Sequence, residues 1–245
     1  MLKQTTIAKL LAEFIGSMFL VMAAVSSMIM FTTVFETHKG IAIFANAIAV
    51  AFVLCALIEI FGSISGAHFN PVVTMVMLFE KKIGATAAVL FVLFQFIGGI
   101  VGTALSRLMF LNDVGTVLAV SNNVRNEYVF FGEIFGTLIL VLAILLLVKA
   151  GSNKISIMIG FLVGGQLMST SSTMFANPQV TVARMFTNTA SGIRPIDGLV
   201  FIVMQIIGAL LAYAIYRLIF AKPPIEQEKT DVLCKRMCVS KNNLP

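Results

Sequence analysis

The chain of 245 residues has no tryptophan, few charged side chains and few potential catalytic or metal-binding groups. Charged residues make up 11% of it, against about 25% in soluble proteins. Hydrophobic residues make up 59%. No water-soluble core needs so much apolar sequence, so the composition excludes a soluble domain and predicts an integral membrane protein.

Cysteine and histidine are too scarce for a disulfide framework or an obvious catalytic site. Cys55 lies in an apolar segment, and Cys234 and Cys238 form Cys-x-x-x-Cys in a basic tail. A metal site or lipid attachment in the tail stays open, although two free thiols are the simpler interpretation. The two histidines, His38 and His68, have no carboxylate or thiol at a catalytic spacing. We expect no enzymatic activity, no cofactor and no metal.

Apolar segments of near membrane-spanning length follow one another along the chain. A transmembrane helix needs about 20 such residues. The segments are residues 7–31, 41–61, 84–106, 128–148, 155–172 and 197–220. They predict a single membrane domain over residues 1–222 and a polar cytoplasmic tail over residues 223–245.

Two shorter apolar stretches lie between these segments, and each opens with Asn-Pro. They begin at Asn70-Pro71 and at Asn177-Pro178. Asn is a preferred N-cap and Pro is tolerated at the first helical position, so each stretch is expected to start a helix. Only about two to three turns follow before charged or polar residues return, too few to cross a bilayer. Both stretches are therefore predicted to be half-helices.

The two halves of the chain repeat one pattern. Residues 7–106 carry Glu13-x-x-Gly, then Asn-Pro, then Gln95-x-x-Gly. Residues 127–220 carry the same series as Glu133-x-x-Gly, Asn-Pro and Gln205-x-x-Gly. Each half has three spans, an odd number, so the second half is inverted relative to the first. Inverted repeats place the functional site near the midplane, where the two half-helices would meet.

The duplicated motif resembles the Asn-Pro-Ala boxes of the aquaporin and glycerol-facilitator channels. Residues 65–74, Ser-Gly-Ala-His-Phe-Asn-Pro-Val-Val-Thr, match it almost letter for letter. The third position departs in both copies, as Val72 and Gln179. The resemblance implies an all-α membrane protein with six transmembrane helices, two re-entrant half-helices and inverted three-span repeats. It also implies a homotetramer with one pore per subunit.

Two helix N-termini that face each other present positive dipole ends and free N–H groups at one point. The amides of Asn70 and Asn177 add donors there. A water molecule held as an acceptor turns its neighbours away in both directions, which interrupts a proton relay, as in aquaporin-type pores. We expect a passive channel for water and small neutral solutes that excludes protons and ions. The alternative is a secondary transporter with inverted repeats coupled to an ion gradient, although no ion site is evident.

In this family an outer constriction sets specificity, and the resemblance places it by offset from the asparagines. The four positions are Val50, Gly165, Met174 and Val180. Val180 stands where water-selective members and glycerol channels carry an Arg, so the ring is expected to be apolar and, with Gly165, wide. We expect solutes such as glycerol, urea, ammonia, peroxide and neutral arsenous acid. Residues 175–184 also resemble a bacterial subgroup with Val at this position, some members of which conduct arsenic species.

Arg184 lies four residues beyond Val180 and hence on nearly the same helix face, one turn outward. Helical side chains lean back toward the N-terminus. The guanidinium therefore either reaches into the mouth of the pore or bonds to carbonyls of an outer loop, and the sequence leaves both open.

Four other polar residues, Glu13, Glu133, His68 and Glu59, remain to be interpreted. Glu13 and Glu133 are charges at membrane depth, which are usually functional or paired, and the resemblance makes them acceptors for the backbone of the re-entrant loops. It makes His68 a structural support of its loop rather than a gate. Glu59 departs from the family. It lies nine residues from Val50, on the opposite helix face, which favours a helix or subunit contact.

The basic residues predict the orientation. With a cytoplasmic N-terminus, most of them fall on the inner side, which agrees with the positive-inside rule. The inner ones are Lys3, Lys9, Lys81, Lys82, Lys149, Lys154, Arg217, Lys222 and the tail, and the outer ones are Lys39, Arg107, Arg125, Arg184 and Arg194. We expect a multi-pass protein of a plasma or inner membrane with both termini cytoplasmic. The net charge of +6 then reflects membrane orientation and not nucleic-acid binding.

Overall fold

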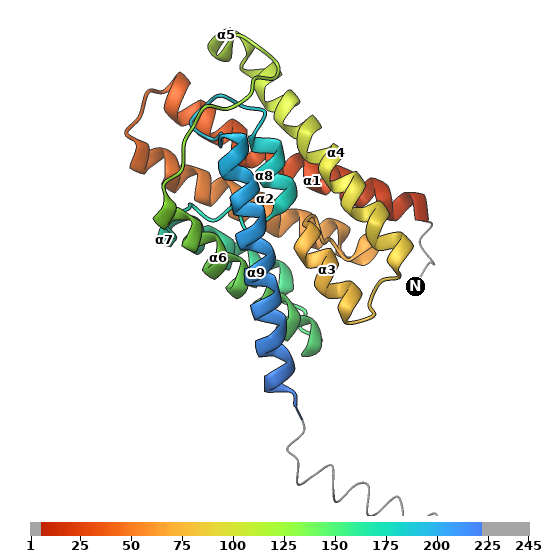
Figure 1. The fold of residues 1–245 in the computed structure, drawn as a ribbon. Coiled ribbons are helices and arrows are strands. Elements are labelled where there is room, and N and C mark those ends of the chain that lie inside the picture. Colours follow the sequence, from red (N-terminus) through yellow and green to blue (C-terminus); the bar gives the residue numbers. More distant parts are fainter. Residues whose placement is uncertain (1–5, 222–245) are drawn as a thin grey trace, which may run out of the picture.

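The computed structural model describes residues 6–221, and every regular element in that range is a helix (Figure 1). The elements are α1 (Thr6–Ile29), a π-helical segment (Met30–Val34), α2 (Lys39–Ser65), α3 (Pro71–Phe79), α4 (Ala85–Met109), α5 (Leu111–Val114), α6 (Glu127–Lys149), α7 (Ile155–Ser169), α8 (Pro178–Arg184) and α9 (Pro195–Ile219). The predicted all-helical membrane fold is confirmed. The tail cysteines, Cys234 and Cys238, lie outside the described residues.

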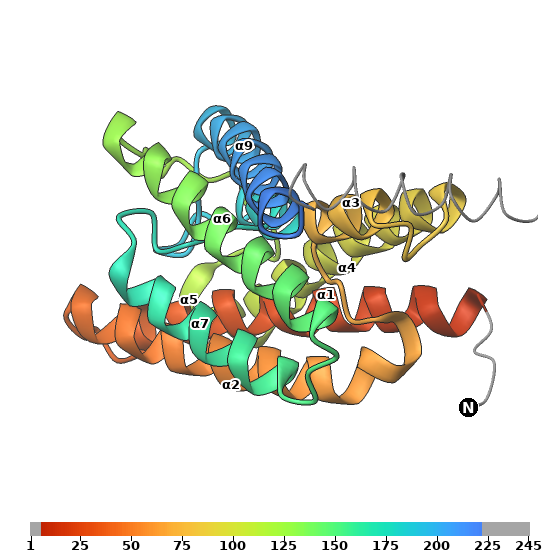
Figure 2. The same ribbon diagram turned by 90° about the horizontal axis from the view of Figure 1, so that it is seen from below.

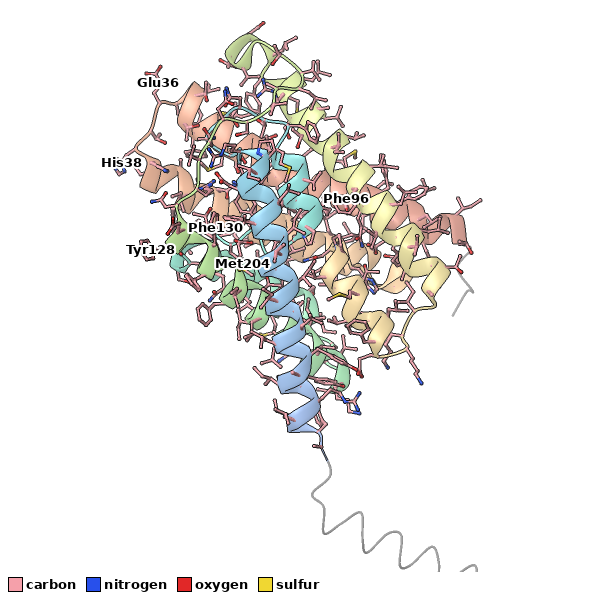
Figure 3. All side chains as sticks on the ribbon, viewed as in Figure 1. Glu36, His38, Phe96, Tyr128, Phe130 and Met204 are labelled. Carbon is pink, nitrogen blue, oxygen red and sulfur yellow. The ribbon has the colours of Figure 1, made fainter. Side chains whose placement is uncertain are left out.

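Five of the described helices are long and apolar enough to cross a membrane, counting α1 together with the π-helical segment. The shorter apolar helix α7 has 15 residues, about 22 Å at 1.5 Å per residue. It ends before the predicted residue 172 because the backbone becomes extended at Thr170 and leads into the second re-entrant loop. Large apolar side chains such as Phe52 and Leu218 are exposed, as expected for surfaces that face lipid. Tyr128, at the start of α6, also points away from the bundle (Figure 3).

The helices of each half cross closely. α1 packs against α4, and α6 packs against α9 in the same way, while α2 lies along α1 and α7 (Figure 2). Small residues make the crossings tight, because a methyl group at Gly98 would overlap the carbonyl of Phe14 and one at Gly208 would overlap that of Ile134. The same small-residue contact therefore recurs in both halves.

The two half-helices lie inside the bundle. α3 has nine residues and α8 has seven, so neither spans a membrane. Each packs against the last long helix of the other half, α3 against α9 and α8 against α4. Both begin at an asparagine that caps its own helix: Asn70 Oδ1 accepts from the Val72 N–H and Asn177 Oδ1 from the Gln179 N–H, each at 3.1 Å.

Candidate functional site

The loops that lead into α3 and α8 share an unusual backbone. In each loop the residues four, three and one before the asparagine have positive φ. They are Gly66, Ala67 and Phe69 in the first loop, and Thr173, Met174 and Ala176 in the second. Left-handed backbone costs a residue other than glycine about 1–3 kcal/mol. The surrounding protein must therefore hold both loops in place.

Two buried carboxylates do so. Glu13 on α1 accepts from the N–H groups of His68 at 3.0 Å and Phe69 at 2.8 Å. Glu133 on α6 accepts from Phe175 at 2.9 Å and Ala176 at 2.8 Å. The same two positions before each asparagine are thus bound in the same way. Each charge is compensated at once, as a buried carboxylate requires.

A glutamine and a threonine complete each support. Gln95 donates to Glu13 at 2.8 Å and to the Thr74 hydroxyl at 3.0 Å. Gln205 donates to Glu133 at 2.6 Å and to the Thr181 hydroxyl at 2.8 Å. The repeated glutamines were evident in the sequence. The threonines were missed, although each stands four residues after its asparagine in both motifs.

The two asparagines join the loops to each other. Asn70 Nδ2 donates to the Ala176 carbonyl and Asn177 Nδ2 donates to the Phe69 carbonyl, both at 2.8 Å. An amide nitrogen carries two N–H donors. Within residues 6–221, one N–H of each asparagine therefore has no partner, and both side chains line a cavity. The helix ends meet as the inverted repeat predicts.

The cavity has a volume of about 610 Å³ and runs along the bundle. On α2 it is lined by residues from Asn46 to Ser65, a rise of roughly 28 Å, which is close to the thickness of a bilayer's hydrocarbon core. Arg184 lies at one end and Lys82 at the other. Aliphatic side chains from three helices form most of its wall: Leu54, Ile58, Leu140, Ile144, Ile159, Val163 and Leu167.

Backbone carbonyls of the loops form its polar side. Those of Gly66, Ala67 and His68 accept no hydrogen bond from residues 6–221, and those of Met174 and Phe175 accept none either. All five residues line the cavity. Unpaired carbonyls at membrane depth are tolerated where they meet water. The lining of the cavity therefore combines loop residues that have unpaired carbonyls with aliphatic side chains.

Three of the four predicted constriction residues line the cavity, and the fourth does not. Val50, Met174 and Val180 lie at its wall. Gly165 is exposed, and a methyl group there would touch nothing within 4 Å. The wall residues on α7 include Ile159, Val163 and Leu167. Gly165 lies two places from both Val163 and Leu167, which rotates it by about 200° from each. Gly165 therefore does not line this cavity, because an offset counted from Asn177 does not fix which face of α7 looks inward.

Val72 and Gln179, which differ from the family's alanine at the third motif position, do not line the cavity. Val72 packs in the buried cluster with α6 and α9. Gln179 is fully buried, donates from Nε2 to the Phe69 carbonyl at 3.3 Å, and lies against Gly99. Both side chains face packed protein, while Asn70 and Asn177 remain at the cavity.

Arg184 makes both contacts that the sequence left open. It lines the cavity, and its Nε donates to the carbonyl of Ser191 in the loop before α9. The guanidinium carbon lies 3.6 Å from the centre of the Phe175 ring, a cation–π contact. His68 lines the cavity nearer its middle, with Nδ1 at 3.1 Å from the Thr74 hydroxyl and its ring edge-on to Phe91.

Glu59 lies at the Lys82 end of the cavity. Its carboxylate accepts from the Ser156 hydroxyl on α7 at 2.7 Å, which is the helix contact that the sequence favours. It also lines the cavity, contrary to the face that the helix angle assigns to it. Glu59 follows the lining residue Ile58, and its long, exposed side chain extends to the rim.

No cluster of three His, Cys, Asp or Glu side chains that could hold a metal occurs within residues 6–221. The described part of the site thus consists of hydrogen-bonding groups and aliphatic walls.

Comparison with known proteins gives a consistent family. The model of the family described as "Major intrinsic protein" matches residues 1–174. The chain is 36% identical over 223 residues to aquaglyceroporin AqpS of Rhizobium meliloti (strain 1021), covering 90% of this chain and 94% of that protein. It is 31% identical over 196 residues to aquaporin-1 of Bos taurus, covering 76% and 69%.

A solved structure supports the fold. The X-ray structure of the aquaglyceroporin from Plasmodium falciparum superposes with a TM-score of 0.68. The match covers 87% of this chain and 95% of that chain, at 17% sequence identity.

Proposed function

Since the chain belongs to the major intrinsic protein family, we propose that its cavity passes uncharged solutes larger than water and excludes ions and protons. The protein is a passive membrane channel for water and small solutes. Members of the family transport solutes and are not enzymes. The relatives named above are called an aquaglyceroporin and an aquaporin, names that favour a channel over the alternative of an ion-coupled transporter.

The aliphatic ring of Val50, Met174 and Val180 supports this solute range. The Val180 side chain has no charge and no hydrogen-bond donor. Solutes that differ in their polar groups can therefore pass the ring. An ion must shed water there without compensation, which is costly. The paired helix ends at Asn70 and Asn177 add a positive potential that repels cations.

Glycerol is the first solute to test, because the relative with 36% identity is named an aquaglyceroporin. Urea, ammonia, peroxide and neutral arsenous acid share its lack of charge. In this proposal Glu13 and Glu133 hold the loops and His68 supports the first loop. The channel domain occupies residues 1–222, assembles as a homotetramer and keeps both termini in the cytoplasm.

Swelling of proteoliposomes in water, glycerol, urea and arsenite tests the solute range. Val180→Arg introduces a charged donor at the ring and is expected to lower glycerol and urea permeability about tenfold, equivalent to about 1.4 kcal/mol on the barrier. Water permeability should be largely spared. Val180→Leu adds bulk without charge and is the matched control. An unchanged solute ranking in Val180→Arg would contradict the assignment of this ring.

A further inference from the structure

Two polar side chains lie one helical turn beyond the aliphatic ring. Asn46 precedes Val50 by four residues on α2, and Arg184 follows Val180 by four residues on α8. Both line the cavity, although they are only 5% and 4% exposed. The step of four residues keeps each of them on the face of its helix that carries the ring residue. They therefore belong to one level of the cavity.

A shared network holds these two residues at the same end. Asn46 Nδ2 donates to the Ala24 carbonyl at 2.9 Å and to the Ser27 hydroxyl at 2.8 Å. The hydroxyl of Ser191 donates to the same Ala24 carbonyl at 3.2 Å, and the Ser191 carbonyl accepts from Arg184 Nε. Asn46 and Arg184 are thus linked through two residues.

The remaining polar atoms of this pair have no partner in the described chain. Asn46 Oδ1 accepts no hydrogen bond, and neither terminal amino group of Arg184 donates one to residues 6–221. None of these atoms is sealed off by protein. They are an acceptor and a fork of donors that the cavity can reach.

Arg184 is also fixed in direction. Its guanidinium packs over the ring of Phe175, and the N–H of Phe175 donates to Glu133. Arg125 approaches the same ring at 5.6 Å and donates to the Gly192 carbonyl at 3.3 Å. Packing and the hydrogen bonds of neighbouring residues thus preorganise the charged group of Arg184 for binding a solute.

We propose that Asn46 and Arg184 form a solute-binding station at the entrance to the aliphatic ring. It takes uncharged molecules that carry a donor and an acceptor on neighbouring atoms, such as polyols and trihydroxy acids. The Arg184 amino groups donate to a hydroxyl oxygen, and Asn46 Oδ1 accepts from an O–H. The solute exchanges its water for these bonds before it enters the apolar ring. This inference rests on the proposed function.

Water and glycerol flux into proteoliposomes test the station. Asn46→Leu removes the acceptor and Arg184→Met removes the donors. Each is expected to lower glycerol permeability about tenfold, the effect of one or two lost hydrogen bonds, and to raise the glycerol concentration at half-saturation. Water permeability should change little. Because both groups act on one solute, the double variant should lose little more than the worse single variant.

Ser26→Ala is the matched control, because the Ser26 hydroxyl on α1 makes no hydrogen bond within residues 6–221 and Ser26 does not line the cavity. Its glycerol-to-water ratio should equal that of the wild type. If Asn46→Leu does not fold, Asn46→Ser also removes the acceptor from that position and carries the same expectation.

The outcomes separate the two proposals. A wild-type protein that passes neither water nor glycerol overturns the proposed function. A wild type that passes both, with an unchanged ratio in Asn46→Leu, overturns the station alone. An equal loss in Ser26→Ala and Asn46→Leu also overturns it, since a general disturbance of the packing around α1 then explains the effect.

Discussion

Val163 and Gly165 lie two residues apart on α7 but face opposite ways. Val163 lines the cavity, whereas Gly165 is exposed. Gly165→Leu should therefore leave water and glycerol permeability unchanged, while helix propensity stabilises α7 by up to about 1 kcal/mol. Val163→Phe should narrow the cavity and lower glycerol permeability more than water permeability. Both permeabilities can be measured by stopped-flow light scattering.

Gly165→Leu is also the control for Val163→Phe, since both add bulk to the same helix. If Gly165→Leu narrowed the solute range, the position of α7 around the cavity would have to be revised.

Among individual residues, the sequence singled out charged ones that lie inside apolar segments and recur in both halves of the chain. Glu13 and Glu133 are charges inside apolar segments at equivalent points of the two halves, which marked them as functional or paired, and the resemblance to the aquaporin family assigned them to the loops. Gly165 could not be placed, because an error of one residue turns a helix by about 100°. Asn46 was missed because an uncharged polar residue within an apolar span gives little signal by itself.

Among the elements, the closest contacts are the crossings of α1 with α4 and of α6 with α9. A methyl group at Gly98 would overlap a backbone carbonyl, which cannot move aside as a flexible side chain can. Gly98→Ala should force the helices apart and destabilise the fold by about 1–3 kcal/mol, the usual cost of overpacking. Thermal unfolding in detergent would show this as a lower midpoint.

Gly84→Ala is the matched control, because a methyl group at Gly84 meets nothing within 4 Å. Its midpoint should stay close to that of the wild type. Equal midpoints for Gly98→Ala and Gly84→Ala would mean that the α1–α4 crossing is looser than described.

Most elements could be predicted because a membrane helix is an apolar run of known length. The six apolar segments and both half-helices appear in the structure, with ends shifted by a few residues. The π-helical segment at Met30–Val34 and the four-residue α5 could not be foreseen, since neither begins at a residue whose side chain caps the helix. The early end of α7 follows from the path of the second re-entrant loop, a tertiary feature.

For the whole molecule, the basic side chains separate into two kinds. Those of the predicted inner side, such as Lys81, Lys149 and Lys154, are exposed. Those of the predicted outer side are mostly engaged by the protein. Arg107 is buried against Thr116 and Thr187, and Arg194 pairs with Asp197 at 2.8 Å. The exposed basic side chains that the protein does not engage therefore lie mostly on the predicted inner side, which strengthens the positive-inside argument.

This asymmetry predicts that the C-terminal tail lies in the cytoplasm. Cys55→Ala leaves Cys234 and Cys238 as the only cysteines. A membrane-impermeant maleimide should then label inverted membrane vesicles and leave intact cells unlabelled, because the tail thiols face the inner solution. Labelling after detergent treatment confirms that both thiols can react. A variant that also lacks Cys234 and Cys238 gives the background, and labelling of intact cells above that background would reverse the proposed orientation.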